Sequence, residues 1–109
     1  MVQNLTGINV QLMVSVWSKF DTNTEFFKDM QAKGFMINGT NYYDVWQAAA
    51  REQFYQYSKK AMFDIGVTAL WLDATEPEGF PNENKPVGDG GKGSGNANFN
   101  SYSLMTTKA

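Results

Sequence analysis

Carboxylates gather directly after an apolar run in this chain of 109 residues. Asp73 follows the apolar residues 67–72, and Glu76 and Glu78 come within the next five positions. A carboxylate placed there can attack a substrate, transfer a proton or bind a hard cation. Because the chain has no histidine and no cysteine, catalysis would depend on carboxylates, hydroxyl groups, lysine or tyrosine. The acidic run lacks the alternating spacing of a calcium loop, so we expect no metal ion and no cofactor.

Tryptophans accompany both apolar runs. Trp71 stands two residues before Asp73, so the two side chains point to the same side of an extended strand. Trp17 ends the first apolar run, residues 10–17. Sugars pack their apolar faces on flat indole rings, but most aromatic side chains of this size form core. Composition alone therefore favours core packing for these rings.

Two buried strands are predicted, at residues 10–17 and 67–72. Both are rich in β-branched and aromatic residues and poor in charge, which suits strands covered on both faces. A helical crossover between them calls for parallel pairing, and hence for an α/β fold. Ligands bind at the carboxyl ends of such strands, where Trp17 and Asp73 would meet.

Two helices are predicted in the crossover. The first spans residues 25–33, after N-cap candidates at 21–24 and before Gly34. The second is capped by Asp44 and ends at Gly66, with Ala50, Phe54, Tyr57, Ala61 and Ile65 recurring every three or four residues. Between them, residues 35–43 contain an Asn-Gly turn and are predicted to form a hairpin or a looped excursion.

The rest of the chain changes character. Residues 79–100 are rich in glycine and asparagine and predict a long polar loop, and residues 98–109 have the pattern of a helix that begins there. Gly88, Gly90 and Gly93 match a dinucleotide-binding spacing, but they lie in this loop and not between a strand and a helix. Nothing divides residues 1–109 into more than a single domain.

Charge and hydropathy argue against two classes of partner. A net charge of -2 provides no basic face for nucleic acid and no polybasic membrane anchor. No apolar run approaches the roughly 18 residues of a membrane-spanning helix.

The run Trp71-Leu-Asp-Ala-Thr-Glu-Pro-Glu78 resembles the nucleophile signature of glycoside hydrolase family 31. Residues 13–20, 43–51 and 103–109 are similar, in the same order, to neighbouring segments of the family's catalytic barrel. The resemblance implies a partial (β/α)8 TIM barrel, of which this chain supplies two central parallel strands with connecting helices and a long polar loop. It also implies that Asp73 is the nucleophile, that Trp17 and Trp71 contact the sugar, and that Glu76 holds Asp73 or the substrate in place.

The implied activity is that of a retaining α-glycosidase. Such an enzyme would remove terminal α-xylosyl, or α-glucosyl, residues from an oligosaccharide substrate such as xyloglucan, and the ending Ala-Thr-Glu-Pro-Glu looks most like the α-xylosidases of the family. In the family the acid/base is an aspartate on a later strand, beyond Ala109. We therefore expect the chain to need the remainder of the parent barrel, and the isolated chain to be inactive.

Two alternatives remain open at this point. One is a non-catalytic carbohydrate-binding or structural remnant of the same barrel, in which Trp17 and Trp71 bind a glycan and no bond is broken. The other is an unrelated α/β domain with a coincidental Trp-x-Asp. In that case strands 10–17 and 67–72 would be antiparallel or far apart.

Overall fold

A computed structural model describes residues 1–73 of the chain. The predicted polar loop and the predicted helix at residues 98–109 lie outside the described residues. The described elements, in chain order, are the helix α1 (Val2–Gly7), the strand β1 (Met13–Val16), the helices α2 (Glu25–Ala32) and α3 (Ala48–Ala61), the 3₁₀ turn η1 (Phe63–Ile65) and the strand β2 (Ala69–Leu72).

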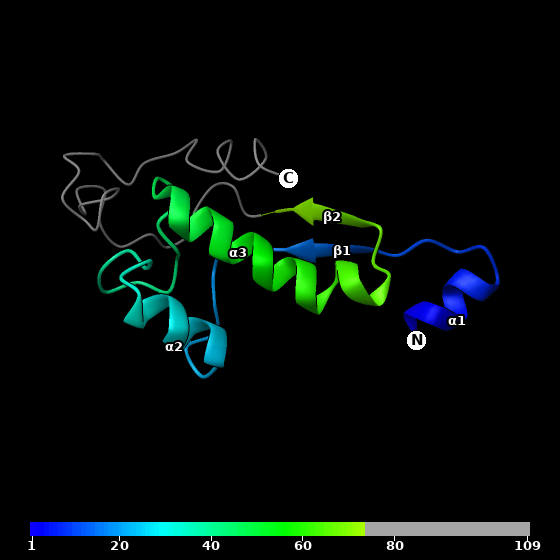
Figure 1. Cartoon of the computed structure of the whole chain (residues 1–109), viewed down its shortest axis with the longest axis horizontal. Helices are drawn as coiled ribbons and strands as arrows, with labels where there is room; N and C mark the ends of the chain where they lie inside the picture. The colour runs from blue at the N-terminus through cyan, green and yellow to red at the C-terminus, as the bar shows by residue number, and fades with distance from the viewer. Residues whose placement is uncertain (74–109) are drawn as a thin grey trace.

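The two strands pair in parallel, as predicted. Met13 lies opposite Ala69, and the register continues to Val16 opposite Leu72. Both arrows in Figure 1 accordingly point the same way, with the crossover helices between them in sequence. Parallel neighbours exclude the arrangement expected of a coincidental Trp-x-Asp.

The prediction that both strands are covered on both faces is wrong for the described residues. Met13 is 58% exposed and Trp71 62% exposed, whereas Leu72 packs against the core cluster on the other side. Successive side chains of a strand point to opposite faces, and helices cover only one of them here. The exposed side chains Met13, Ser15, Trp71 and Asp73 are called the open face below.

Helix α2 forms where the sequence predicted it. Thr24 caps it, because the Thr24 Oγ1 accepts a hydrogen bond from the Phe27 N–H at 3.2 Å. Phe27 and Met30 are buried. Gly34 follows with a φ of +71°, a left-handed conformation that suits glycine after a helix.

Helix α3 begins at Ala48, three residues later than a cap at Asp44 would place it. The Asp44 carboxylate instead accepts hydrogen bonds from the Trp46 N–H and the Gln47 side-chain amide. This side chain therefore closes a local turn before the helix, a common use of aspartate. At the other end Gly66 stops η1 with a φ of +102°, and Ile65, predicted on the apolar stripe, is half exposed.

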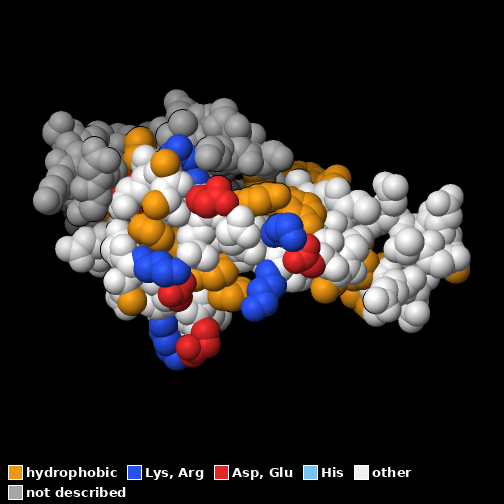
Figure 2. Space-filling model, in the orientation of Figure 1, with side chains coloured by type: hydrophobic (Ala, Val, Ile, Leu, Met, Phe, Trp, Pro, Cys, Tyr) orange, Lys and Arg blue, Asp and Glu red, His pale blue; other side chains and the backbone are white. Residues whose placement is uncertain are grey.

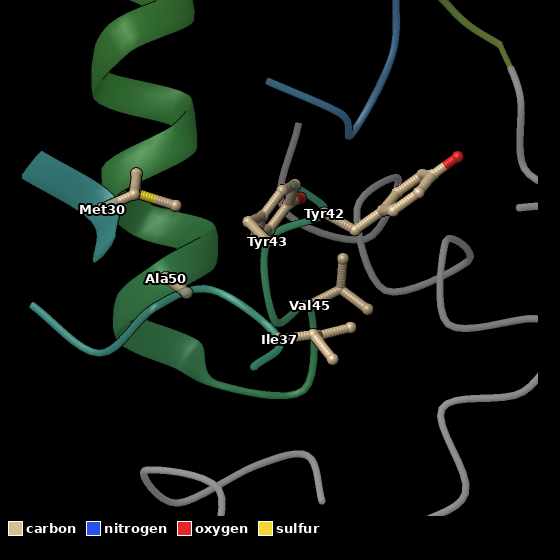
Figure 3. Close-up of a cluster of buried hydrophobic side chains, with 6 residues drawn as sticks. All are labelled: Met30, Ile37, Tyr42, Tyr43, Val45 and Ala50. Carbon is tan, nitrogen blue, oxygen red and sulfur yellow. The ribbon is translucent and has the colours of Figure 1, made fainter. Parts of the chain in front are cut away.

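The core lies between the helices and the looped segment 34–47, which is called the excursion below. Its cluster of buried side chains comes from α2, α3 and the excursion: Met30, Ile37, Tyr42, Tyr43, Val45 and Ala50. Figure 3 shows Tyr43, Val45 and Ile37 close together beside α3, with the Tyr42 ring directed away from them. The excursion, which contains the predicted turn region, thus contributes four of the six side chains of this cluster.

Helix α1 was not predicted. It has six residues, no buried residue and no side-chain cap, so little in its sequence distinguishes it from a loop. It touches the rest of the chain near Gly66, where an added Cβ would come within 3.2 Å of the Val2 side chain. In Figure 1 it lies beyond the amino ends of the strands.

The helix surface carries charges of both signs. Three ion pairs lie on it: Lys28 with Glu25, Lys33 with Asp29, and Lys59 with Asp64. Figure 2 shows such blue and red side chains next to each other on this side of the molecule. None of the helices described is both long and apolar enough to cross a membrane.

Candidate active site

Asp73 stands at the carboxyl end of the sheet, directly after β2. Its backbone N–H donates a hydrogen bond to the Val16 carbonyl at 3.0 Å. This bond extends the parallel ladder by one step past Leu72, and so it fixes the Asp73 backbone against the end of β1. The side chain is exposed, as a carboxylate that meets a substrate must be.

Trp71 shares the open face with Asp73. It lies opposite Ser15 in the strand pairing, and its large exposed fraction contradicts the core packing that composition favoured. An exposed indole on the same side of a strand as a carboxylate, two residues away, provides a flat apolar surface beside a charged group. That combination suits a sugar ring, which has apolar faces and polar edges.

Trp17 follows β1 at the same edge of the sheet, and it is 48% exposed. The register, continued by one residue, brings its backbone level with Asp73. Trp17 also borders an apolar cavity of about 210 Å³, which β1 forms with side chains of both helices, among them Phe26, Phe54 and Tyr57. The structure therefore unites Trp17 and Asp73 through the backbone at one end of the sheet, while part of Trp17 lies against the helix side.

The excursion reaches the same edge. Tyr43 donates its N–H to the Ser18 carbonyl at 3.3 Å, and Phe20 donates its N–H to the Asn41 carbonyl at 2.8 Å. The Asn41 side-chain amide returns a hydrogen bond to the Phe20 carbonyl at 3.0 Å. Sequence reasoning missed Asn41, because an asparagine among turn residues gives no sign of a contact 21 positions away.

A second polar contact joins the two helices beside the cavity. The Tyr57 hydroxyl donates a hydrogen bond to the Asp29 carboxylate, which also accepts one from Lys33. The hydrogen bond from Lys33 lowers the pKa of Asp29, and the bond from Tyr57 lowers it further. Burial raises the pKa of Tyr57, and its bond to the Asp29 carboxylate acts in the same direction. These groups hold α2 against α3 and lie on the helix side, not on the open face.

Glu76, the remaining predicted site residue, lies outside the described residues. Within residues 1–73, no group of three or more histidine, cysteine, aspartate or glutamate side chains is arranged to hold a metal ion. The described part of the site thus consists of one carboxylate, two exposed indoles and the hydrogen bonds by which the excursion holds residues 18–20, just after β1.

Curated relatives resemble this chain over most or all of its length. An alpha-xylosidase of Saccharolobus solfataricus is 39% identical over 117 aligned positions, which cover the whole chain. An uncharacterized family 31 glucosidase of Pseudescherichia vulneris is 32% identical over 72% of the chain. The chain spans 15% and 17% of the lengths of these two proteins.

Solved structures agree in fold. A family 31 alpha-xylosidase from a soil metagenome, complexed with xylose, matches with a TM-score of 0.63 at 28% identity, over 75% of this chain and 14% of its own. A family 31 alpha-xylosidase from Xanthomonas citri also matches with a TM-score of 0.63, at 26% identity, over 71% of this chain and 10% of its own.

The model of the glycosyl hydrolases family 31 TIM-barrel domain matches residues 1–109. The part described has two parallel strands with their helices, which is a piece of such a barrel and not a closed one. With the family model matched along the whole chain and two curated relatives above 30% identity, this chain belongs to glycoside hydrolase family 31.

Proposed function

We propose that residues 1–109 are the nucleophile-bearing segment of a retaining α-glycosidase that removes terminal α-xylosyl residues from oligosaccharides. The observation that carries the proposal is the position of Asp73 in a family 31 chain. It is an exposed carboxylate at the carboxyl end of paired parallel strands, and its N–H is bonded to β1. Active sites of (β/α)8 barrels lie at that end of the strands.

The chemistry assigned to Asp73 is nucleophilic. Its carboxylate oxygen attacks the anomeric carbon, the bond from that carbon to the leaving oxygen breaks, and a second carboxylic acid gives its proton to the leaving oxygen. Water then cleaves the glycosyl-aspartate ester, and the second group takes the proton back. We propose that this second group comes from the remainder of the barrel, and that Glu76 orients Asp73 or the substrate.

The choice of xylose over glucose rests on the relatives. One curated relative and both solved structures above are alpha-xylosidases, whereas the Pseudescherichia protein is described as a glucosidase. The open face supports a sugar substrate of either kind, because Trp71 offers an indole surface beside Asp73. A non-catalytic glycan-binding role uses the same indole, so the test must detect bond cleavage.

A chimera tests the function in a complete barrel. Residues 1–109 replace the matching segment of the Saccharolobus alpha-xylosidase, and the product is treated with a fluorosugar that leaves a slowly hydrolysed glycosyl-enzyme. We expect hydrolysis of an aryl α-xyloside, with the label mapped to Asp73 by peptide mass spectrometry. Asp73→Asn should lower kcat by at least about a thousandfold and abolish labelling, as loss of a nucleophile does.

Asp64→Asn is the matched control, because Asp64 is an exposed aspartate paired with Lys59 on the helix side. It should leave labelling and turnover intact. A folded chimera that binds xylosides but neither turns over nor labels at Asp73 would overturn the proposal in favour of the non-catalytic role. Should the full graft fail to fold, a graft of residues 67–78 alone carries the same test. Turnover by the isolated chain 1–109 would contradict the assignment of the second carboxylic acid to the rest of the barrel.

A further inference from the structure

The chain that leaves β1 is held by the excursion at three points. The Ser18 carbonyl accepts from the Tyr43 N–H, the Phe20 N–H donates to the Asn41 carbonyl, and the Phe20 carbonyl accepts from the Asn41 side chain. An antiparallel bridge between Lys19 and Tyr42 lies between these contacts. Trp17 is therefore followed at once by a segment whose backbone is tied down.

Only one of these three hydrogen bonds depends on the type of side chain. The Asn41 amide is the donor to the Phe20 carbonyl, in a part-buried position. Removing the donor from a part-buried carbonyl costs free energy, because water only partly replaces the lost hydrogen bond. Asn41 thus grips the Phe20 peptide through both its main chain and its side chain.

The residues that support Asn41 are packed in the core. Tyr43, two residues after Asn41, is 1% exposed, and its ring stacks on Phe54 with a centroid separation of 4.8 Å. The Phe20 ring packs edge-on against both of these rings. Through these ring contacts and the hydrogen bonds of Asn41, the packed core holds residues 18–20 in place.

On its other side Trp17 is held by the sheet. Val16 is paired with Leu72, and its carbonyl accepts the Asp73 N–H. Trp17 thus lies between Val16, whose carbonyl binds the Asp73 N–H, and Ser18, whose carbonyl binds the excursion. The position of Trp17 relative to Asp73 depends on both attachments.

We propose that Asn41 is a positioning residue for the sugar site, acting through Trp17. The inference rests on the proposed function. By fixing residues 18–20, Asn41 sets where the Trp17 indole stands at the edge of the site, and with it the affinity for the sugar. It does not touch the reacting atoms, so it affects binding more than the bond-breaking step.

The test measures KM and kcat for an aryl α-xyloside in the chimera described above. Asn41→Ala and the isosteric Asn41→Asp, which lacks the donor, should each raise KM about three- to tenfold, with kcat within about twofold. Asn4→Ala and Asn4→Asp are the matched controls, because Asn4 lies exposed on α1, and neither should change KM. Thermal unfolding of each variant separates a local effect from loss of the fold.

A double-mutant cycle with Trp17 tests whether Asn41 affects KM through the Trp17 indole. In a Trp17→Ala background, Asn41→Ala should change KM by less than about twofold, because the indole that it positions is gone. Two independent, multiplying effects would overturn the inference, as would a Trp17→Ala variant with unchanged KM or an Asn41 variant that loses kcat alone. Failure of the unsubstituted chimera to label at Asp73 would instead contradict the proposed function, so the two failures are distinct.

Discussion

The helix side and the open face of the sheet differ in how completely they are packed. On the helix side, Met30 and Tyr43 are buried almost fully, and aromatic rings stack on one another. On the open face, Met13 and Trp71 are more than half exposed although both lie in paired strands. A parallel sheet is ordinarily covered on both sides. Residues 1–73 thus contain a packed helix layer on one side of their strands, and no covering layer among the described residues on the other side.

Stability and the proposed chemistry depend on different regions of the described chain. The cluster of buried apolar side chains lies among α2, α3 and the excursion. The exposed carboxylate and indole that we assign to the sugar lie across the sheet from them. The excursion connects the two, because it belongs to the core and also makes hydrogen bonds to residues 18–20, just after β1.

Replacing a methionine on each side should give the largest contrast. Met30→Ala removes a fully buried side chain and should lower the free energy of unfolding by roughly 2–5 kcal/mol. Met13→Ala makes the same change on the open face and should cost less than about 0.5 kcal/mol in the chain 1–109. Urea unfolding followed by circular dichroism measures both. Equal losses would mean that the open face is packed in solution.

The same two substitutions should have different costs in a complete barrel. If other strands cover the open face there, Met13→Ala should become costly in the chimera, while the cost of Met30→Ala should stay about the same. An unchanged, small cost of Met13→Ala in the chimera would show that the open face remains exposed to water.

Glycine substitutions test how firmly α1 belongs to the helix side. Gly66 and Gly34 both have positive φ, so alanine at either position costs roughly 1–2 kcal/mol in backbone strain. Only at Gly66 would the new Cβ also press on Val2, at 3.2 Å; at Gly34 nothing lies within 4 Å. Gly66→Ala should therefore be the more destabilising in thermal unfolding, and Val2→Ala should remove the difference. Identical effects would show that α1 is not held there.

Two hydroxyl groups lie in the region that joins the two sides, and removing them should change the free energy of unfolding by different amounts. The Thr40 Oγ1 donates to the Ile37 carbonyl at 2.9 Å and accepts from the Tyr42 N–H at 3.2 Å, so Thr40→Val should cost about 1 kcal/mol or more. The Ser18 Oγ is buried without a hydrogen-bond partner in the described part of the chain, so Ser18→Ala should cost nothing or stabilise slightly. Chemical denaturation compares them. A large loss in Ser18→Ala would reveal a partner for that hydroxyl.

Of these predictions, the smallest change in the free energy of unfolding is expected from lowering the pH, through Asp29 on the helix side. Lys33 and Tyr57 lower the pKa of Asp29, so its stabilising effect is present above the unfolded-state pKa of about 3.9 and is lost as the pH falls through the lower folded-state value. In Tyr57→Phe the pKa of Asp29 should rise, and stability should fall less between pH 5 and pH 2. Tyr55→Phe, on the exposed side of α3, is the control. Parallel pH profiles for all three proteins would contradict the role of Tyr57.

Much of the fold could be predicted from the sequence because it follows from local pattern. The apolar runs gave the two strands, the crossover between them gave their parallel pairing, and Thr24 and Gly34 marked the ends of α2. Asp73 was found because an aspartate after an apolar run is costly unless it meets solvent or a ligand. Trp71 was placed beside Asp73 because side chains two residues apart on a strand point to the same face. The nucleophilic role of Asp73 and the positioning role of Glu76 remain predictions.

Other features were decided by tertiary structure alone. Asp44 has the sequence signature of a helix cap, and only the neighbouring amides show that it closes a turn instead. A tryptophan such as Trp71 is most often a core residue, and only the absence of a covering layer among the described residues leaves its indole exposed. Asn41 clasps a peptide 21 residues away. Local sequence determines which conformations are favourable, whereas burial and long-range hydrogen bonds depend on which segments the fold brings together.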